Sequence, residues 1–213
     1  MVKLVSITEP KIGSGISSAE DLISYCARVS NPINQLNTET APKLLKYLID
    51  HKHWSPYEMV SFTVEIKTSR AIAAQILRHR SFSFQEFSQR YSQSTSLEKI
   101  EWRSQGKTNR QVGEEETELA DSLAIQVAEL QTDALDIYNK LLKAGIAKEC
   151  ARMILPLNTS TTLYMAGTVR SWIHFLSLRT KEDTQKEHRD IANEIKKIFI
   201  EEFPITSCAL NWI

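Results

Sequence analysis

The segment Val60-Ser61-Phe62-Thr63-Val64-Glu65-Ile66-Lys67 alternates apolar and polar side chains at every step. A period of two residues places one set on each face of an extended strand, so the apolar set is expected to face a core. Ser69 follows as a candidate N-cap for a helix that would carry Ile72, Ala73, Ile76 and Leu77 on its apolar side. These features predict a sheet that contains this strand and is flanked by helices.

Residues 78–92 follow that helix with the sequence RHRSFSFQEFSQRYS. Arginine binds phosphate or carboxylate in a planar, bidentate manner and stays charged at any working pH. The neighbouring amides and hydroxyls can read the edge of a base, and the phenylalanines can anchor the stretch in a core. Gln75, Arg78 and His79 lie at positions i, i+3 and i+4 and are therefore predicted to share one face of this helix. The residue types indicate a nucleotide site, although cations at the end of a helix are also typical of simple capping.

The remaining patterns indicate an α+β fold, with a mixed or antiparallel sheet flanked by helices, in a single domain spanning residues 1–213. Weak alternation predicts an edge strand over residues 1–8, and a Thr-rich segment predicts another strand at 159–165. Ser18 and Asp21 form a partial capping box for the first helix. The side chains predicted to face inward from that helix are Leu22, Ile23, Cys26 and Val29.

Helical spacing predicts five further helices, one of them long. The acidic run 114–118 would begin the long helix and Gly145 would end it. Thr184 and Glu187 would form a capping box for the last helix. Residues 93–112 show little periodicity and are expected to form a mobile excursion, with a short strand at 100–102. The predicted helices span 40–54, 117–144, 148–153, 168–178 and 184–202.

The chain has 213 residues, with 26 Lys and Arg balanced by 26 Asp and Glu. This neutrality argues against a nucleic-acid or anionic-lipid partner. No apolar run approaches the length of a membrane span, and the first residues lack the apolar core of a signal peptide. Cys26, Cys150 and Cys208 form no Cys-x-x-Cys pair, so we expect buried, reduced thiols in a cytoplasmic protein. His51 and His53 have no further ligand at suitable spacing, so no metal site is expected.

Arg78-His79-Arg80, followed after seven residues by Ser88, resembles the signature of the flavin-dependent thymidylate synthases. The match extends through Gln85, Glu86, Arg90 and Tyr91. Further segments match in order, so the resemblance covers most of the chain, from Ser18 to Arg189. Members often have His at Met59 and Asn at Thr168 and His174. The further matching segments are His53-Trp54-Ser55-Pro56-Tyr57-Glu58, Ala151-Arg152-Met153-Ile154-Leu155-Pro156, Thr168-Val169-Arg170, Arg179 and Gln185-x-Glu187-x-Arg189.

The resemblance implies a methyltransferase that reductively methylates dUMP to dTMP. It implies FAD as cofactor, with NADPH and 5,10-methylenetetrahydrofolate as co-substrates, and a homotetramer with sites shared between subunits. Arg179 would activate the pyrimidine and Ser88 would assist at the catalytic site, while the Gln185-x-Glu187-x-Arg189 segment would be mainly structural. The implied dUMP-binding residues are Gln75, Ile76, Leu77, Arg78, Glu86, Phe87, Ser88, Gln89, Arg90, Arg152 and Arg179. The implied FAD-binding residues are His53, Ser55, Arg78, His79, Arg80, Glu86, Thr168, Val169, Arg170 and His174.

Three functional hypotheses remain open from the sequence. None of the cysteines stands in a Pro-Cys-Gln context, which removes the obvious nucleophile of a thiolate mechanism and favours the flavin route. The segment 78–90 would suit single-stranded RNA if a second basic patch accompanied it. A flavin-binding protein without catalytic activity is the third hypothesis, supported by Thr168 and His174.

Overall fold

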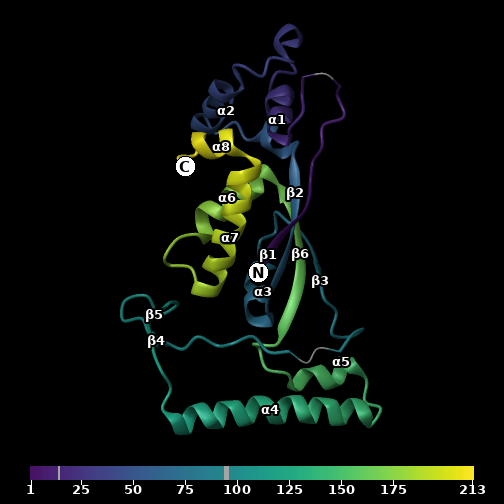
Figure 1. Cartoon of the computed structure of the whole chain (residues 1–213), viewed down its shortest axis with the longest axis vertical. Helices are drawn as coiled ribbons and strands as arrows, with labels where there is room; N and C mark the ends of the chain where they lie inside the picture. Colours follow the sequence, from purple (N-terminus) through teal and green to yellow (C-terminus); the bar gives the residue numbers. More distant parts are fainter. Residues whose placement is uncertain (14, 94–95) are drawn as a thin grey trace.

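The computed structural model describes residues 1–13, 15–93 and 96–213. Its centre is a four-stranded antiparallel sheet with the strand order β1-β2-β6-β3 (Figure 1). The strands are β1 (Val2–Ile7), β2 (Ser61–Ser69), β3 (Ser83–Glu86) and β6 (Ser160–Thr168). The predicted α+β class, the edge strand and both inner strands are therefore confirmed. The segment that follows the helix capped by Ser69 also returns to this sheet, where it forms β3.

The inner pair β2 and β6 aligns over nine residues, from Ser61 opposite Thr168 to Ser69 opposite Ser160. The alternating side chains of β2 bury Phe62, Val64 and Ile66, as the sequence period requires. Trp172 stacks on Phe62 with ring centroids 4.6 Å apart and donates its indole N–H to the Phe62 carbonyl oxygen. One hydrophobic core thus joins the sheet to the helices that cover it.

Eight α-helices and three short 3-10 segments are found among the described residues. Ser18 caps α1 in a full capping box with Asp21, and Ser69 and Thr168 cap α3 and α6. The helices are α1 (Ala19–Ala27), α2 (Ala41–Asp50), α3 (Arg70–Ile76), α4 (Asp121–Lys143), α5 (Lys148–Ala151), α6 (Val169–Arg179), α7 (Lys186–Glu202) and α8 (Pro204–Ala209). The 3-10 segments are η1 (Pro32–Asn34), η2 (Ser55–Glu58) and η3 (Arg152–Ile154).

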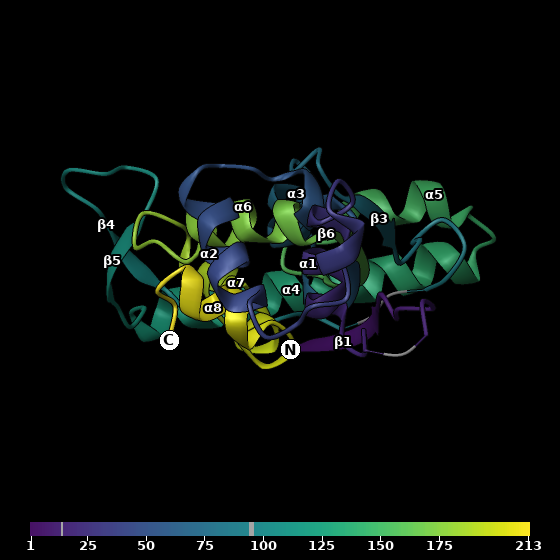
Figure 2. The same ribbon diagram turned by 90° about the horizontal axis from the view of Figure 1, so that it is seen from above.

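The helices form distinct groups along an elongated molecule. In Figure 1, α1, α2 and α8 gather at the top, α6 and α7 lie to the left of the sheet, and α4 crosses the bottom. A two-stranded sheet, β4 (Arg103–Gln105) with β5 (Gly113–Glu116), lies on the side away from β3 and α5, as Figure 2 also shows. None of the helices in the described ranges is long and apolar enough to cross a bilayer.

Several helix boundaries differ from the sequence prediction, and α2 ends at Asp50, before the predicted residue 54. Helix α3 ends at Ile76, so Arg78 and His79 lie in the turn that follows and do not share a helical face with Gln75. The long helix begins at Asp121, because the acidic residues predicted to begin it form β5 opposite β4. The predicted stop at Gly145 is confirmed by its positive φ of 83°.

The excursion and the last helix also need correction. The short strand lies at Arg103–Gln105, three residues after the predicted 100–102, because pairing with β5 sets its position. Residues 94 and 95 of the excursion lie outside the described residues, and its mobility stays a prediction. Helix α7 has no side-chain cap: the Thr184 hydroxyl faces the Leu178 carbonyl, and Glu187 binds other partners.

Some side chains predicted to be buried are exposed. Val29 follows the end of α1 and is 69% exposed. Cys150 and Cys208 are exposed and Cys26 is half-buried, so the predicted burial of the thiols is wrong, although all three are unpaired. Each exposed position lies near the end of a helix, where the helical period no longer sets which way a side chain points.

Candidate active site

A cleft of about 580 Å³ opens between η2 and α6. Helix α6 presents Arg170, His174 and Ser177 to it at positions i, i+4 and i+7, which is one face of a helix. Trp54, Ile173 and Leu210 supply apolar walls beside these polar groups. The complete lining is Trp54, Glu58, Ser81, Arg170, Ser171, Ile173, His174, Ser177 and Leu210.

Only some of the residues predicted to bind FAD line this cleft. Arg170 and His174 line it, and Arg170 forms an ion pair with Glu58. Thr168 is occupied as the cap of α6, because its hydroxyl oxygen accepts the Ser171 N–H. Val169 is fully buried and donates its N–H to the Val60 carbonyl oxygen, so neither its side chain nor its N–H is available to a ligand. His53 and Ser55 adjoin the cleft on either side of Trp54 in the sequence.

The sequence prediction did not include several residues that line the cleft. Trp54 and Glu58 stand inside the segment quoted for the resemblance, but no role was assigned to them. Helical spacing from Arg170 would have identified Ser177. Ser81 gives no signal in the sequence, because its position depends on a contact with α6.

That contact places the turn after α3 beside the cleft. The Ser171 hydroxyl donates a hydrogen bond to the Ser81 carbonyl oxygen over 3.2 Å. The turn is closed by backbone bonds, including that from His79 N–H to the Ile76 carbonyl. Arg78 and Arg80 extend from it as exposed side chains. The structure therefore brings the Arg78-His79-Arg80 segment to the edge of the cleft.

His79 and Arg179 are joined directly. The Arg179 Nε–H donates to His79 Nε2 over 2.9 Å, and the imidazole packs edge-on against Phe175 with ring centroids 4.8 Å apart. Burial, followed by the charge of Arg179, lowers the pKa of His79 to about 4. His188 lies behind this pair, fully buried, with its ring centroid 6.1 Å from that of His79. Arg179 thus keeps its full positive charge, because its partner is a neutral imidazole.

Two residues near the end of β3, Glu86 and Phe87, are predicted to bind dUMP but form hydrogen bonds to other residues of the chain. Glu86 accepts hydrogen bonds from Arg70 over 2.6 Å and from the Thr161 hydroxyl over 2.9 Å. Phe87 continues the pairing of the sheet by donating its N–H to the Thr162 carbonyl oxygen. Glu86 thus fixes the end of β3 against the neighbouring strand.

A second hollow, of about 340 Å³, lies between the segment that follows β3 and the start of α5. Arg90 pairs there with Glu149 over 3.3 Å, and Ser88 is exposed beside it. Gln89 is only 5% exposed, and its Nε2 has no hydrogen-bond partner within the described part of the chain. The lining residues are Ser88, Arg90, Tyr91, Ala147, Lys148 and Glu149.

The structure assembles the predicted site only in part. The cleft and the second hollow share no lining residue. Arg152 is half-buried at the start of η3, directly after α5. Ile76 is fully buried in the core and Leu77 is 37% exposed, so the Ile76 side chain is not available to a ligand. Groups predicted for one site therefore lie on two separate parts of this chain.

Comparisons with known proteins show the family of the chain. The family described as thymidylate synthase complementing protein matches residues 13–205. A probable flavin-dependent thymidylate synthase of Paramecium bursaria Chlorella virus 1 is 53% identical over 214 residues, and the alignment covers 99% of each chain. The flavin-dependent thymidylate synthase of Synechocystis sp. is 50% identical over 216 residues, also covering 99% of each.

A solved structure is also similar along the whole chain. The crystal structure of PolB from Streptomyces cacaoi, a UMP/dUMP methylase bound with 5-Br dUMP, superimposes with a TM-score of 0.82. It is 25% identical, and the match covers 100% of this chain and 95% of that one. The family match over most of the chain and the two full-length relatives lead to one assignment. The chain belongs to the thymidylate synthase complementing protein family, that of the flavin-dependent thymidylate synthases.

Proposed function

We propose that this enzyme methylates dUMP to dTMP in a flavin-dependent reaction, with FAD as the flavin. One observation carries the proposal: four of the six arginines of the predicted site have no carboxylate partner and are free to bind anions, whereas Arg90 and Arg170 pair with Glu149 and Glu58. Across the described residues, no carboxylate forms an ion pair with Arg78, Arg80, Arg152 or Arg179. Unpaired guanidinium groups suit the phosphates of a nucleotide and of a dinucleotide cofactor.

The cleft beside α6 has a donor set that fits a flavin. Trp54, Ile173 and Leu210 can pack against a flat ring system, and Arg170, His174 and the serine hydroxyls can bind its polar groups. Arg78 and Arg80 lie at the edge of the same cleft, where phosphates would find cations. When bound, FAD reduced by NADPH supplies the hydride, and 5,10-methylenetetrahydrofolate supplies the carbon.

Arg179 is the residue that we assign to activation of the pyrimidine. Its Nε–H is directed to His79, which leaves the two terminal nitrogens of the guanidinium to bind a ligand. Placed at the N3–C4–O4 edge of the ring, this charge favours the electron-rich, ionised form that methylation at carbon 5 requires. The neutral His79 orients the guanidinium without cancelling its charge.

Cysteine takes no part in this mechanism. No cysteine lines the cleft or the second hollow, and within the described residues no hydrogen bond joins the Ser88 hydroxyl to a base that would make it a nucleophile. We assign Ser88, Gln89 and Arg90 to binding of the nucleotide together with Arg152. The three free thiols are also typical of a cytoplasmic enzyme, which is the location that we propose.

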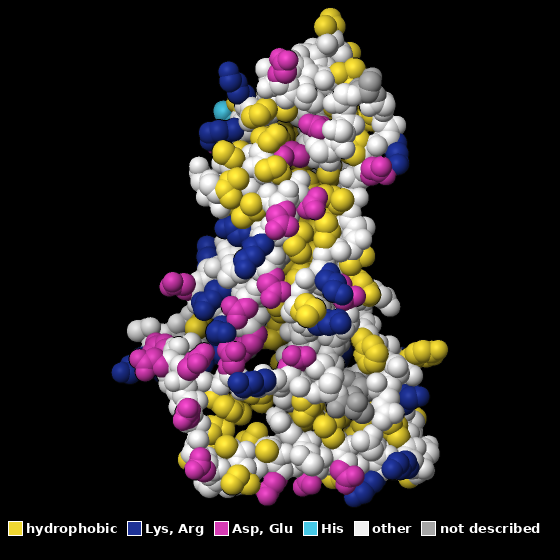
Figure 3. Space-filling view, viewed as in Figure 1, with side chains coloured by type: hydrophobic (Ala, Val, Ile, Leu, Met, Phe, Trp, Pro, Cys, Tyr) yellow, Lys and Arg dark blue, Asp and Glu magenta, His cyan; other side chains and the backbone are white. Residues whose placement is uncertain are grey.

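A homotetramer with shared sites accounts for the separation of the two hollows. Leu123, Leu130 and Ile137 repeat every seven residues along α4 and are 47%, 69% and 49% exposed. Figure 3 shows hydrophobic side chains gathered at the lower left, above the position of this helix. An apolar heptad row of this kind is typical of helix packing between chains. We propose that association through α4 brings the cleft of one subunit to the second hollow of another.

The deciding experiment measures dTMP formation from dUMP, 5,10-methylenetetrahydrofolate and NADPH, with and without added FAD. We expect product that depends on FAD. We expect Arg179→Ala to reduce the rate by about a hundredfold or more while the flavin absorbance of the protein is retained. Arg110→Ala, which removes an exposed arginine far along the chain from the site, is the matched control and should keep full activity.

Each alternative outcome has a definite meaning. Flavin-loaded wild-type protein that forms no dTMP would favour the flavin-binding protein without catalysis. Protein that neither binds flavin nor forms product would refute the proposal as a whole. Undiminished turnover in Arg179→Ala would remove only the role assigned to that residue.

A further inference from the structure

A buried carboxylate of α1 caps a helix at the other end of the chain. Glu20 is only 3% exposed, and its two oxygens accept the N–H groups of Ile205 over 3.1 Å and of Thr206 over 2.5 Å. Both donors stand in the first turn of α8, directly after Pro204, which has no N–H of its own. Phe203 occupies the N-cap position, and its apolar side chain cannot accept a hydrogen bond. Glu20 therefore supplies, from α1, the cap that the sequence around α8 lacks.

This contact sets the position of α8 relative to α1. In the part of the chain that the structure describes, no cation forms an ion pair with Glu20, so the two N–H groups are what stabilise its charge. Burial raises the pKa of Glu20 despite these hydrogen bonds, so the carboxylate takes up a proton more readily than an exposed one. Moving α8 away would leave a buried carboxylate and two N–H groups without partners, which is costly.

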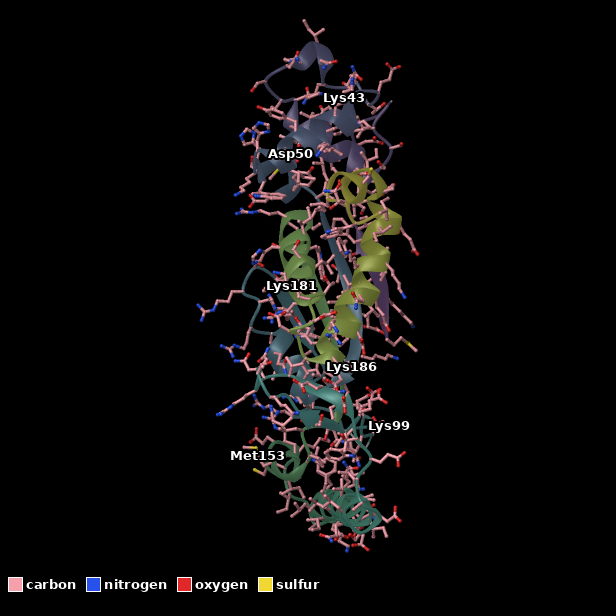
Figure 4. The ribbon with its side chains drawn as sticks, turned by 90° about the vertical axis from the view of Figure 1, so that its left-hand side faces the viewer. Lys43, Asp50, Lys99, Met153, Lys181 and Lys186 are labelled. Atoms are coloured by element: carbon pink, nitrogen blue, oxygen red, sulfur yellow. The ribbon has the colours of Figure 1, made fainter. Side chains whose placement is uncertain are left out.

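Helix α8 in turn carries one wall of the cleft. Leu210 is the C-cap of this helix, donates its N–H to the Thr206 carbonyl oxygen over 2.9 Å, and lines the cleft beside α6. Figure 4 shows α8, in yellow, just below α2, which carries the labelled Lys43 and Asp50. Leu210 thus reaches the cleft because α8 is held at this end of the molecule.

The segment after Leu210 has an anchor of its own on α7. The Trp212 ring packs edge-on against Phe199 with ring centroids 5.2 Å apart, and Lys196 Nζ lies 4.7 Å from the centroid of the same ring. Leu210 therefore lies between two anchors, the carboxylate of Glu20 before it and the indole of Trp212 after it. Because the second anchor remains, loss of the first is expected to shift α8 rather than to unfold it.

We propose that Glu20 is a positioning residue for the flavin: it holds α8 so that Leu210 packs against the cofactor in the cleft, and it acts without touching the cofactor. The inference rests on the proposed function, which places the flavin in this cleft. Leu210 lies beyond residue 205, where the family match ends, so this wall comes from outside the matched region. The sequence gives no sign of the contact, because 185 residues separate Glu20 from Ile205.

Two substitutions separate the cap from the wall. Glu20→Gln keeps the size of the side chain but replaces one oxygen by an NH₂ group, which cannot accept a hydrogen bond. One N–H of α8 then faces another donor, so the start of the helix must move. Leu210→Ala removes the apolar wall itself. If Glu20 acts through Leu210, adding Glu20→Gln to a chain that already carries Leu210→Ala should have little further effect.

The test titrates FAD into the full-length protein freed of flavin and follows flavin fluorescence. It is made at pH 8, where Glu20 is more completely ionised than at neutral pH. We expect Leu210→Ala and Glu20→Gln each to weaken FAD binding about tenfold, because apolar surface that the cofactor covers is lost or displaced. The double variant should also bind about tenfold more weakly, not about a hundredfold. By contrast, Glu20→Gln combined with His174→Ala, on the face of α6, should weaken binding by the product of the two single effects.

Glu201→Gln is the matched control. It makes the same substitution at an exposed carboxylate in the last turn of α7, just before α8. This variant should bind FAD as tightly as the wild type. If Glu20→Gln does not fold, hydrogen exchange in the wild type decides the question. Coupling between two sites is reciprocal, so FAD should slow the exchange of the amides in residues 204–213.

The outcomes separate this inference from the proposed function. Wild-type affinity in Glu20→Gln, an equal loss in Glu201→Gln, or exchange in residues 204–213 that FAD does not slow would each overturn the inference. Fully multiplied effects in the double variant with Leu210→Ala would overturn it too, by showing that Glu20 acts by another route. An equal shortfall in the pair with His174→Ala would show a general distortion of the cleft, with the same consequence. A wild type that binds no FAD would instead refute the proposed function.

Discussion

Histidine 188 should make the stability of this protein depend on pH. Its side chain is fully buried, and neither ring nitrogen has a hydrogen-bond partner in the described ranges. Phe175 packs against the ring with centroids 5.8 Å apart, and the charged or titratable groups nearest to it are Arg179 and His79. Burial, followed by the charge of Arg179, lowers the pKa of His188 from 6.5 to about 4.

The sign and size of the effect follow from proton linkage. Between pH 6.5 and pH 4 the unfolded chain binds a proton at His188 that the folded chain does not. Stability is therefore fully present above pH 6.5 and is lost as the pH falls toward 4. The pKa difference corresponds to a loss of about 2 kcal/mol in the free energy of unfolding between pH 8 and pH 5.

The assay is urea unfolding at a fixed protein concentration from pH 8 to pH 5, for the wild type and for His188→Phe. The variant keeps an aromatic ring against Phe175 but cannot be protonated. We expect its loss of stability over this range to be smaller than that of the wild type by about 2 kcal/mol. His79 remains as a source of residual pH dependence. A variant with the full wild-type dependence, and an unchanged near-ultraviolet circular dichroism spectrum at pH 8, would refute the reasoning.

Three other substitutions test separate parts of the structure. Gly167→Ala places a Cβ 2.4 Å from the Phe82 ring. We therefore expect thermal denaturation to show a loss of about 1–3 kcal/mol in the free energy of unfolding. An unchanged midpoint would contradict the close packing. Cys150→Ala should leave dTMP formation unchanged, because the thiol is exposed; complete loss of activity in folded protein would reopen the thiolate route. Leu130→Glu should lower the mass measured by light scattering, whereas Glu129→Gln should not. An unaltered mass in Leu130→Glu would remove α4 from the interface.

The sequence was most informative where one short segment contains the whole signal. The alternation of β2 and the capping box of Ser18 with Asp21 depend on neighbouring residues only, and both are confirmed. The acidic run before α4 was misread because its partner strand lies about ten residues earlier. Strand pairing is not local, so pairing overrode the local preference for a helix start.

By itself, the sequence determined the α+β class, the strands β1, β2 and β6, and the motifs that place the chain in its family. Only the tertiary structure decided which of those groups meet. Arg179 reaches His79 across 100 residues, and Gln75 reaches Gln185 across 110. The terminal guanidinium nitrogens left free on Arg179 follow from the first of these contacts. A hydrogen bond forms only within about 3 Å and in one direction, and residue order alone fixes neither the distance nor the direction.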